Sequence, residues 1–233
     1  MVGEDKGNSA HRIWVLVDER PGTAAQTLGV ADALGIVHEE IPLEWGSGAG
    51  LPNPLLGASQ NGLSRAARKR LAPPWPDLVI AAGRRAGPVA RYIKRQSGGR
   101  TFLAQLMYPG RSGAPEFDLI AVPNHDGLQP RRNFLGVTGA PHRVNEKSLQ
   151  AAAQAWNPLL GHYDRPLVGL VVGGATRRKG FPRAQARDLG ARAARFAAAA
   201  KGTLLVATSP RTGDEAADEI INGVRSEGIT PGL

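Results

Sequence analysis

Residues 18–23 (DERPGT) form the first of several short segments whose side chains and glycines suit acid–base chemistry or anion binding. They follow an apolar stretch and precede a helix-like pattern. Backbone amides at the start of a helix bind anions, and Gly22 allows a ligand to approach the backbone closely. Asp18 could act as a general base or bind a hydroxyl group. It could equally cap the helix that follows it.

Two further segments of the same kind follow later apolar stretches. Residues 83–88 (GRRAGP) place Arg84 and Arg85 on a turn at the start of a helix, which suits a phosphate or carboxylate. The alternative is that one arginine is solvated and the other fixes a loop. In residues 123–126 (PNHD), His125 lies beside an aspartate and is a candidate acid–base group, although loop histidines are more often simple surface residues.

The last third of the chain contains a glycine turn and a hydroxyl-rich turn. Residues 171–179 (VVGGATRRK) offer the amides of Gly173 and Gly174 to a pyrophosphate, with the hydroxyl of Thr176 beside them. Residues 208–212 (TSPRT) add Ser209 and Arg211. Two strand ends that direct similar groups to one edge favour an anion site over ordinary helix capping.

Several other chemistries are not supported. The glycine spacing matches neither the dinucleotide-binding motif nor the P-loop, and the zinc-hydrolase and α/β-hydrolase motifs are absent from the sequence. The chain has no cysteine, which excludes thiolate metal sites and cysteine nucleophiles. We therefore expect no metal and no cofactor, and any catalysis would use oxygen and nitrogen groups.

The charge balance indicates an anionic ligand more than a nucleic acid. The 233 residues include 29 Lys and Arg against 20 Asp and Glu, a net charge of +9, and 23 of the 29 are arginine. Arginine favours bidentate recognition of phosphate or carboxylate, although coding bias also explains such a composition. The arginines are spread along the chain and aromatic residues are only 5%, so nucleic-acid binding is not expected. Because the sequence has no long apolar run, we expect a cytoplasmic protein, or one that associates peripherally with a membrane.

The elements that must position these residues alternate between short β-rich runs and helix-like stretches, which predicts parallel strands joined by crossover helices. The fold class is therefore α/β, with a Rossmann-like, doubly wound parallel sheet and an incomplete second Rossmann-like domain. We predict an N-terminal domain at 1–145, a connector helix at 146–165 and a partial C-terminal domain at 166–233. Predicted strands are 13–17, 37–41, 78–82, 101–106, 119–122, 134–137, 167–172 and 203–207, and predicted helices are 23–34, 59–71, 86–97, 146–159, 183–200 and 214–224.

The second domain is predicted to be incomplete because it contains only two strands. Its open edges and uncovered apolar face cost free energy, so we expect that the chain is truncated at its C-terminal end. The rival interpretation is a small accessory lobe. Residues 42–57 and 108–116 are predicted loops at the carboxyl edge of the first sheet, where α/β proteins bind ligands.

Taken together in this order, the motifs resemble the mitochondrial-fission "elongated mitochondria" family and its bacterial relatives. The likeness covers nearly the whole chain and rests on residues 18–29, 76–85, 117–126, 139–143, 172–174 and 208–212. It implies a fold similar to GT-B glycosyltransferases, with a cleft between two Rossmann-like halves. Plant members are linked to mitochondrial fission through recruitment of dynamin-related proteins, and the bacterial members look like glycosyltransferases. Family members usually continue further, through the strands that hold the donor ribose.

On this resemblance, our leading hypothesis is a bacterial, metal-independent glycosyltransferase-like protein that binds a nucleotide-sugar for cell-envelope glycan synthesis. The donor phosphates would contact Gly173, Gly174, Thr176, Ser209 and Arg211. The acceptor would face Asp18, Gly22, Arg84, Arg85 and His125, with Asp18 or His125 as the base. The alternative is a non-catalytic adaptor that binds a protein partner or an anionic membrane surface.

Overall fold

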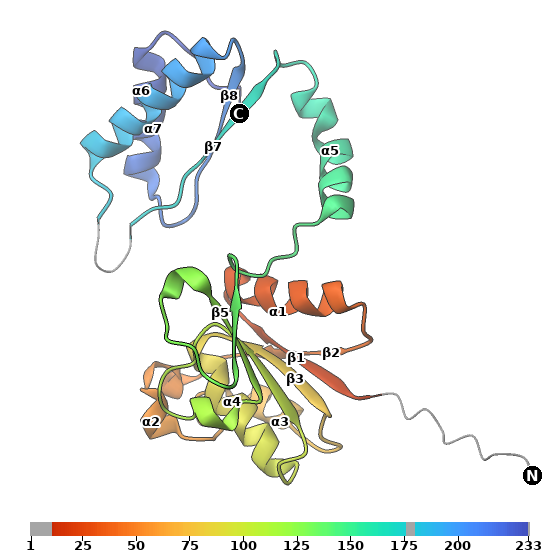
Figure 1. The fold of residues 1–233 in the computed structure, drawn as a ribbon. Helices are drawn as coiled ribbons and strands as arrows, with labels where there is room; N and C mark the ends of the chain where they lie inside the picture. The colour runs from red at the N-terminus through yellow and green to blue at the C-terminus, as the bar shows by residue number, and fades with distance from the viewer. Residues whose placement is uncertain (1–10, 176–179, 233) are drawn as a thin grey trace, which may run out of the picture. The chain divides into compact units, whose positions relative to one another are not determined.

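The computed structural model describes residues 11–175 and 180–232, which form an α/β protein (Figure 1). Residue contacts divide the chain into two compact units, Met1–Ser148 and Leu149–Leu233. We call them unit 1 and unit 2 and describe each by itself. The predicted fold class is confirmed by the parallel sheet of unit 1 and the helices that flank it.

The sheet of unit 1 has six parallel strands in the order β2-β1-β3-β4-β5-β6. The strands are β1 (Ile13–Asp18), β2 (Glu39–Leu43), β3 (Leu78–Ala82), β4 (Phe102–Leu106), β5 (Leu119–Pro123) and β6 (Phe134–Val137). The direction of strand addition reverses between β1 and β3. In doubly wound sheets the crevice at such a reversal, beside the carboxyl ends of the strands, is the usual ligand site.

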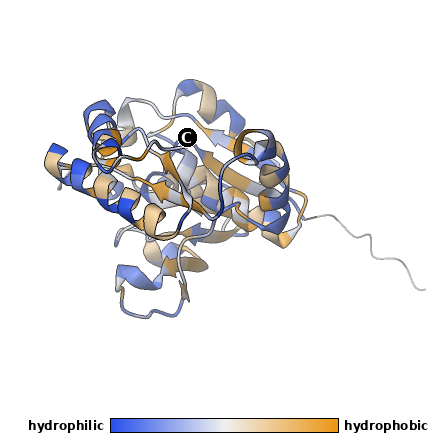
Figure 2. Ribbon diagram, turned by 90° about the horizontal axis from the view of Figure 1, so that it is seen from above, coloured by the Kyte–Doolittle hydropathy of each residue, from blue (hydrophilic) through white to orange (hydrophobic). Residues whose placement is uncertain are grey.

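Helices cover both faces of this sheet. On one face α1 (Pro21–Leu34) packs against a cluster that includes Val15, Ile80 and Leu106. On the other face α3 (Arg65–Arg70) and α4 (Gly83–Gln96) cover a larger cluster that includes Trp14 and Leu103. Burial on both faces explains the continuous apolar character of the central strands. In Figure 2 the strands carry most of the hydrophobic colour, while the helices alternate between hydrophobic and hydrophilic.

Alternation along β1 decides which side of the sheet its last residue faces. Trp14 and Leu16 belong to the cluster under α3 and α4, and Val15 belongs to the cluster under α1. Because side chains in a strand alternate between the two faces, Asp18 shares the face of Trp14 and Leu16. The sequence thus directs the Asp18 carboxylate toward α4.

Three predicted elements were misplaced. The helix predicted at 59–71 is only α3, because Ser64 caps it by accepting a hydrogen bond from the amide of Ala67 at 3.1 Å. The strand predicted at 37–41 is displaced by two residues to β2. The helix predicted at 86–97 begins three residues earlier, at Gly83, directly after β3. Arg84 and Arg85 therefore belong to the first turn of α4 and not to a turn before it.

The two predicted loops of unit 1 contain short helical turns. Residues 42–57 include the 3-10 turn η1 (Ser47–Gly50) and the short helix α2 (Asn53–Leu56). The stretch after β4 includes η2 (Ala114–Glu116), and η3 (Asn124–Asp126) follows β5 directly. These turns let the backbone of both loops satisfy part of its own hydrogen bonding.

Unit 2 has a two-stranded parallel sheet with helices on one face. Its elements are α5 (Glu146–Leu160, which begins at the end of unit 1), β7 (Leu167–Val171), α6 (Arg183–Ala199), β8 (Thr203–Ala207) and α7 (Asp214–Ser226). The side chains of α6 and α7 pack on Leu170, Val206 and Leu204. After α7 the chain returns to β8, where the Gly232 amide donates to the Leu204 carbonyl at 2.8 Å.

Glycine makes the contact between α6 and α7 unusually close. A Cβ atom at Gly190 would lie 2.0 Å from the carbonyl oxygen of Ile220, and one at Gly223 would lie 2.0 Å from that of Arg187. The two helices therefore meet backbone to backbone, and a side chain at either position would force them apart.

Candidate functional site

Asp18 lies at the reversal point of the unit 1 sheet and is bound by Arg85. The carboxylate accepts hydrogen bonds from the guanidinium group of Arg85 at 2.8 and 3.2 Å and from the amide of Arg20 at 2.9 Å. The side chain of Asp18 is only 4% exposed and that of Arg85 16%. A buried carboxylate is thus neutralised by a half-buried guanidinium, which is what burial of the Asp18 charge requires.

Trp45, two residues after β2, covers the other side of Arg85. The guanidinium carbon of Arg85 lies 4.6 Å from the centre of the Trp45 ring, and the Trp45 amide donates to Glu19 at 3.1 Å. A cation over an aromatic face adds an attraction of about 0.5–2 kcal/mol. Together Asp18 and Trp45 fix the Arg85 side chain within the protein.

The guanidinium group of Arg84 is also bound within unit 1, by hydrogen bonds to the loop after β2. Its guanidinium group donates to the Leu51 carbonyl at 2.9 Å and to the Asn53 side-chain oxygen at 3.1 Å. In return, the Asn53 amide group donates to the carbonyls of Arg84 and Pro109. The buried Asn53 thus joins the loop after β2 to the start of α4 and to the loop after β4. The structure places Arg84 as a loop-fixing residue.

Gly22 lies in the first turn of α1, four residues after Asp18. Space is open where its side chain would project, and its amide has no hydrogen-bond partner among residues 11–175 and 180–232. Pro21 precedes it and has no amide hydrogen. The start of α1 therefore offers the Gly22 amide to solvent on the same edge of the sheet as Asp18.

His125 lies away from these residues. It follows β5, which is three strand positions from β1 in the sheet, a separation of about 14 Å at the usual strand spacing. Its side chain is 69% exposed and its Nε2 is 3.7 Å from Asp126. The structure does not bring His125 to Asp18, although both lie at the carboxyl edge of the sheet.

Two carboxyl groups in unit 1 have lowered pKa values, and both have structural partners. The pKa of Glu44 is lowered by its hydrogen bond and attraction to Arg70, whose guanidinium lies 2.7 Å away. At Glu116, burial acts to raise the pKa, but hydrogen bonds from Arg91 and Arg95 outweigh it and the net shift is downward. These shifts describe ion pairs that join loops to helices, not a proton-transfer group.

In unit 2 the turns that follow β7 and β8 interlock. The Ala175 amide donates to the Arg211 carbonyl at 3.0 Å. A Cβ atom at Gly174 would lie 1.8 Å from that same carbonyl oxygen, so only glycine fits. The residues predicted from the sequence therefore lie together on these two turns, which we call the unit 2 rim: Gly173, Gly174, Ser209 and Arg211. Thr176, predicted to join them, lies outside the described residues.

Thr212 connects the two turns and was not among the predicted site residues. Its hydroxyl donates to the Gly173 carbonyl, lies 3.3 Å from the Val172 carbonyl and accepts from the Ser209 amide at 3.0 Å. The side chain is buried. A hydroxyl one residue before a glycine and a helix is an ordinary capping pattern, so the sequence alone did not single it out.

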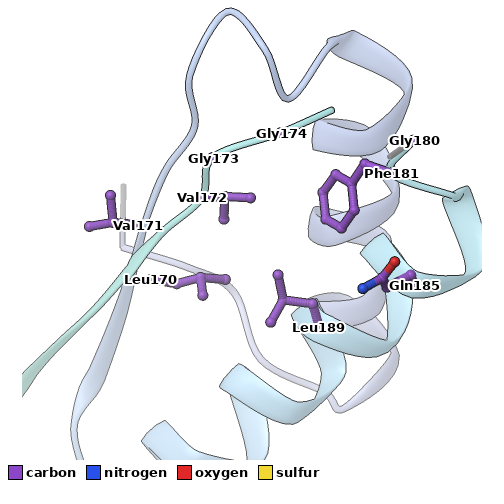
Figure 3. Close-up of a pocket in the computed structure, with 9 residues that line it drawn as sticks. All are labelled: Leu170, Val171, Val172, Gly173, Gly174, Gly180, Phe181, Gln185 and Leu189. Carbon is purple, nitrogen blue, oxygen red and sulfur yellow. The ribbon is translucent and has the colours of Figure 1, made fainter. Parts of the chain in front are cut away.

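A pocket of about 360 Å³ opens beside the glycine turn (Figure 3). Its volume lies in the range of small-ligand sites. Most of the wall is apolar, and among the described residues that line it only Gln185, near the start of α6, has a side-chain amide. The lining residues are Leu170, Val171, Val172, Gly173, Gly174, Gly180, Phe181, Gln185 and Leu189.

The helix starts on this rim differ in charge. The first turn of α6 contains no acidic residue, whereas Asp214 and Glu215 occupy the first turn of α7. Because the start of a helix carries partial positive charge, an anion is favoured at the start of α6. At the start of α7 the acidic side chains already compensate this partial charge. The pocket adjoins α6, so the rim is best suited to an anion on the β7 side.

Neither a metal site nor a membrane span is found in the described part of the chain. No group of three or more His, Asp or Glu residues there could hold a metal ion. No described helix is both long enough and apolar enough to cross a bilayer.

Comparison with known proteins gives a consistent set of relatives. A family model described as Mitochondrial fission ELM1 matches residues 21–229. The chain is 28% identical over 155 residues to the mitochondrial fission protein ELM1 of Arabidopsis thaliana, covering 57% of this chain and 36% of that protein. It is 34% identical over 115 residues to the uncharacterized protein RP120 of Rickettsia prowazekii (strain Madrid E), covering 49% and 32%. The matched part thus spans about a third of each of these relatives.

Proposed function

Because the chain belongs to the mitochondrial fission ELM1 family, whose model matches most of its length, we propose that it is a glycosyltransferase-like protein that binds a nucleotide-sugar. The diphosphate of the donor would bind on the unit 2 rim. The rim residues Ser209 and Arg211 and the amides of Gly173 and Gly174 would contact it, and we assign the same role to Thr176 from the sequence.

The unit 2 rim supports this proposal through its combination of polar and apolar surface. No atom of the described residues lies within 4 Å of the Cβ position of Gly173, so a ligand can approach its backbone there. The apolar pocket beside it has the size to accept a flat, weakly polar group attached to the phosphates, with Phe181 and Leu189 as its walls. Backbone amides and Arg211 would stabilise the charge that develops on a leaving diphosphate without a metal ion.

For the acceptor, we propose the carboxyl edge of the unit 1 sheet. The exposed His125 is the accessible candidate base, and the Gly22 amide at the start of α1 has no partner among the described residues. Asp18 is enclosed by Arg85, so it could accept an acceptor hydroxyl only if that ion pair opened. We therefore assign Arg85 the role of holding Asp18, and Arg84 that of holding the loop after β2.

The interlocked glycine and hydroxyl turns beside the pocket are the observation that carries the proposal. Isothermal titration calorimetry of the full chain with UDP, GDP, ADP and CDP tests it. We expect one of these to bind, and Arg211→Ala to weaken that binding about tenfold or more, the usual value of a charged hydrogen bond. Arg225→Ala, an exposed arginine in the last turn of α7, is the matched control. Binding of none of the four nucleotides would refute the proposal.

A second candidate function is that of a non-catalytic adaptor. The observation that favours it is α5, none of whose residues is buried and which exposes Leu149, Trp156 and Leu159 by 46–58%. The net charge of +9 would add attraction to an anionic protein or a membrane surface. Co-sedimentation with anionic lipid vesicles that is lost in Trp156→Gln but retained in Arg211→Ala would support the adaptor.

A further inference from the structure

We infer that the hydroxyl of Thr212 is the positioning group of the unit 2 rim: it turns two successive peptide groups so that the amides of Gly173 and Gly174 form a paired donor site for one phosphate oxygen. This inference rests on the proposed function for the identity of the ligand. It adds a residue whose role is to orient the backbone and not to touch the ligand.

The contacts of Thr212 reach across from one turn to the other. Its single hydroxyl proton is donated to the carbonyl of Gly173, and the carbonyl of Val172 lies at 3.3 Å. Its oxygen also accepts the Ser209 amide at 3.0 Å, and the Ser209 hydroxyl lies 3.4 Å from it. Two neighbouring carbonyls therefore face one buried hydroxyl.

The planarity of the peptide bond fixes what this does to the amides. In a trans peptide the carbonyl of one residue and the N–H of the next point in opposite directions. Since the carbonyls of Val172 and Gly173 both face Thr212, the N–H groups of Gly173 and Gly174 both face away from it. Successive N–H groups that point to the same side form an anion-binding concavity.

The neighbouring contacts indicate which side these amides face. The Val172 amide donates to Ala207, the last residue of β8, at 2.8 Å, so Val172 has both its polar groups on the β8 side. The amides of Gly173 and Gly174 point the other way and have no partner among the residues that the structure describes. The pocket lies there, since its lining comes from β7, the glycine turn and α6 (Figure 3).

The glycines contribute separately to this arrangement. Gly174 presses on the Arg211 carbonyl and keeps the two turns in contact, whereas nothing lies within 4 Å of the Cβ position of Gly173. Gly174 is thus required for packing, and Gly173 leaves room for the ligand. Thr212 sets the direction in which both donate.

The test compares Thr212→Val with Thr212→Ser in the full chain. Valine keeps the shape but removes the hydroxyl, and serine keeps the hydroxyl. Binding of the nucleotide found in the calorimetric screen is measured by titration. Hydrogen exchange of residues 172–175 is followed by mass spectrometry, and thermal unfolding reports stability. We expect Thr212→Val to weaken binding about tenfold and to accelerate exchange, and Thr212→Ser to match the unchanged protein in both.

The outcomes separate this inference from the proposed function. If the unchanged protein binds the nucleotide and Thr212→Val binds it equally well, the positioning role is overturned and the proposed function stands. If no nucleotide binds but exchange at 172–175 rises in Thr212→Val and not in Thr212→Ser, the positioning role stands and the proposed function fails. If both variants lose stability equally without faster local exchange, Thr212 is only a packing residue and the inference is refuted.

Discussion

Replacing Asp18 by asparagine tests whether the reversal point of the unit 1 sheet depends on a buried ion pair. Asparagine has nearly the same shape and still accepts the Arg20 amide through its side-chain oxygen. It has no charge to offer Arg85, whose guanidinium lies 2.8 Å from the carboxylate and is 16% exposed. The substitution thus leaves the half-buried cation of Arg85 without its charged partner.

The expected cost follows from that burial. Removing one member of a buried ion pair destabilises a protein by about 3–5 kcal/mol, because the remaining charge stays desolvated. Such a loss is a large part of the total stability of about 5–15 kcal/mol that domains have. With a urea dependence of about 1–3 kcal/mol per molar, the unfolding midpoint should fall by about 1–5 M. The cation–π contact of Arg85 with Trp45 offsets only a small part of this loss.

The assay is urea unfolding followed by tryptophan fluorescence, which reports on unit 1 through Trp14, Trp45 and Trp75. Asp126→Asn is the control, because its contact with His125 is exposed and 3.7 Å long, and it should change the free energy of unfolding by less than about 1 kcal/mol. The double variant Asp18→Asn with Arg85→Met should be more stable than Asp18→Asn alone. A loss of under 1 kcal/mol in Asp18→Asn would refute the reasoning.

Three further predictions concern packing and pH. Gly174→Ala should lower the thermal midpoint and abolish nucleotide binding, because its Cβ would lie 1.8 Å from a carbonyl oxygen, whereas Gly169→Ala, with nothing within 4 Å, should do neither. Gly190→Ala should destabilise unit 2 by about 1–3 kcal/mol in urea unfolding, despite the better helix propensity of alanine. The ion pairs of Glu116 lower its folded pKa below the ordinary value of 4.5, so their stabilisation is present above that pH and is lost as the pH falls through the folded pKa. Glu116→Gln should therefore be less stable than the unchanged protein near neutral pH, and the difference should shrink in acid; a difference independent of pH would contradict this.

Much of the fold could be predicted because its signals are local. The strands predicted at 78–82, 134–137 and 203–207 coincide with β3, β6 and β8, since each is a short β-rich run. The start of α3 could not be predicted in this way. The stretch before Ser64 is equally polar, so the sequence does not show that Ser64 is the residue that caps the helix. Which residue caps a helix depends on contacts such as the bridge between Trp45 and Leu63, which are distant in sequence.

The candidate site could be predicted in its residue types but not in its pairings. The sequence indicated Asp18 and Arg85 as separate groups, each with an open structural alternative. Asp18 and Arg85 meet because side chains alternate along β1, which directs Asp18 toward α4, and because β1 lies beside β3, the strand before α4. Both conditions depend on the order of the strands in the sheet. Thr212 shows the same limit, since its role comes from carbonyl groups about 40 residues away.

The make-up of the unit 2 rim has a consequence for how it would respond to its surroundings. The groups described on it are backbone amides, hydroxyls and the guanidinium of Arg211, so the rim offers hydrogen-bond donors and positive charge to an anion. The affinity of the rim for an anion would then rise with the negative charge of that anion and fall as the salt concentration increases.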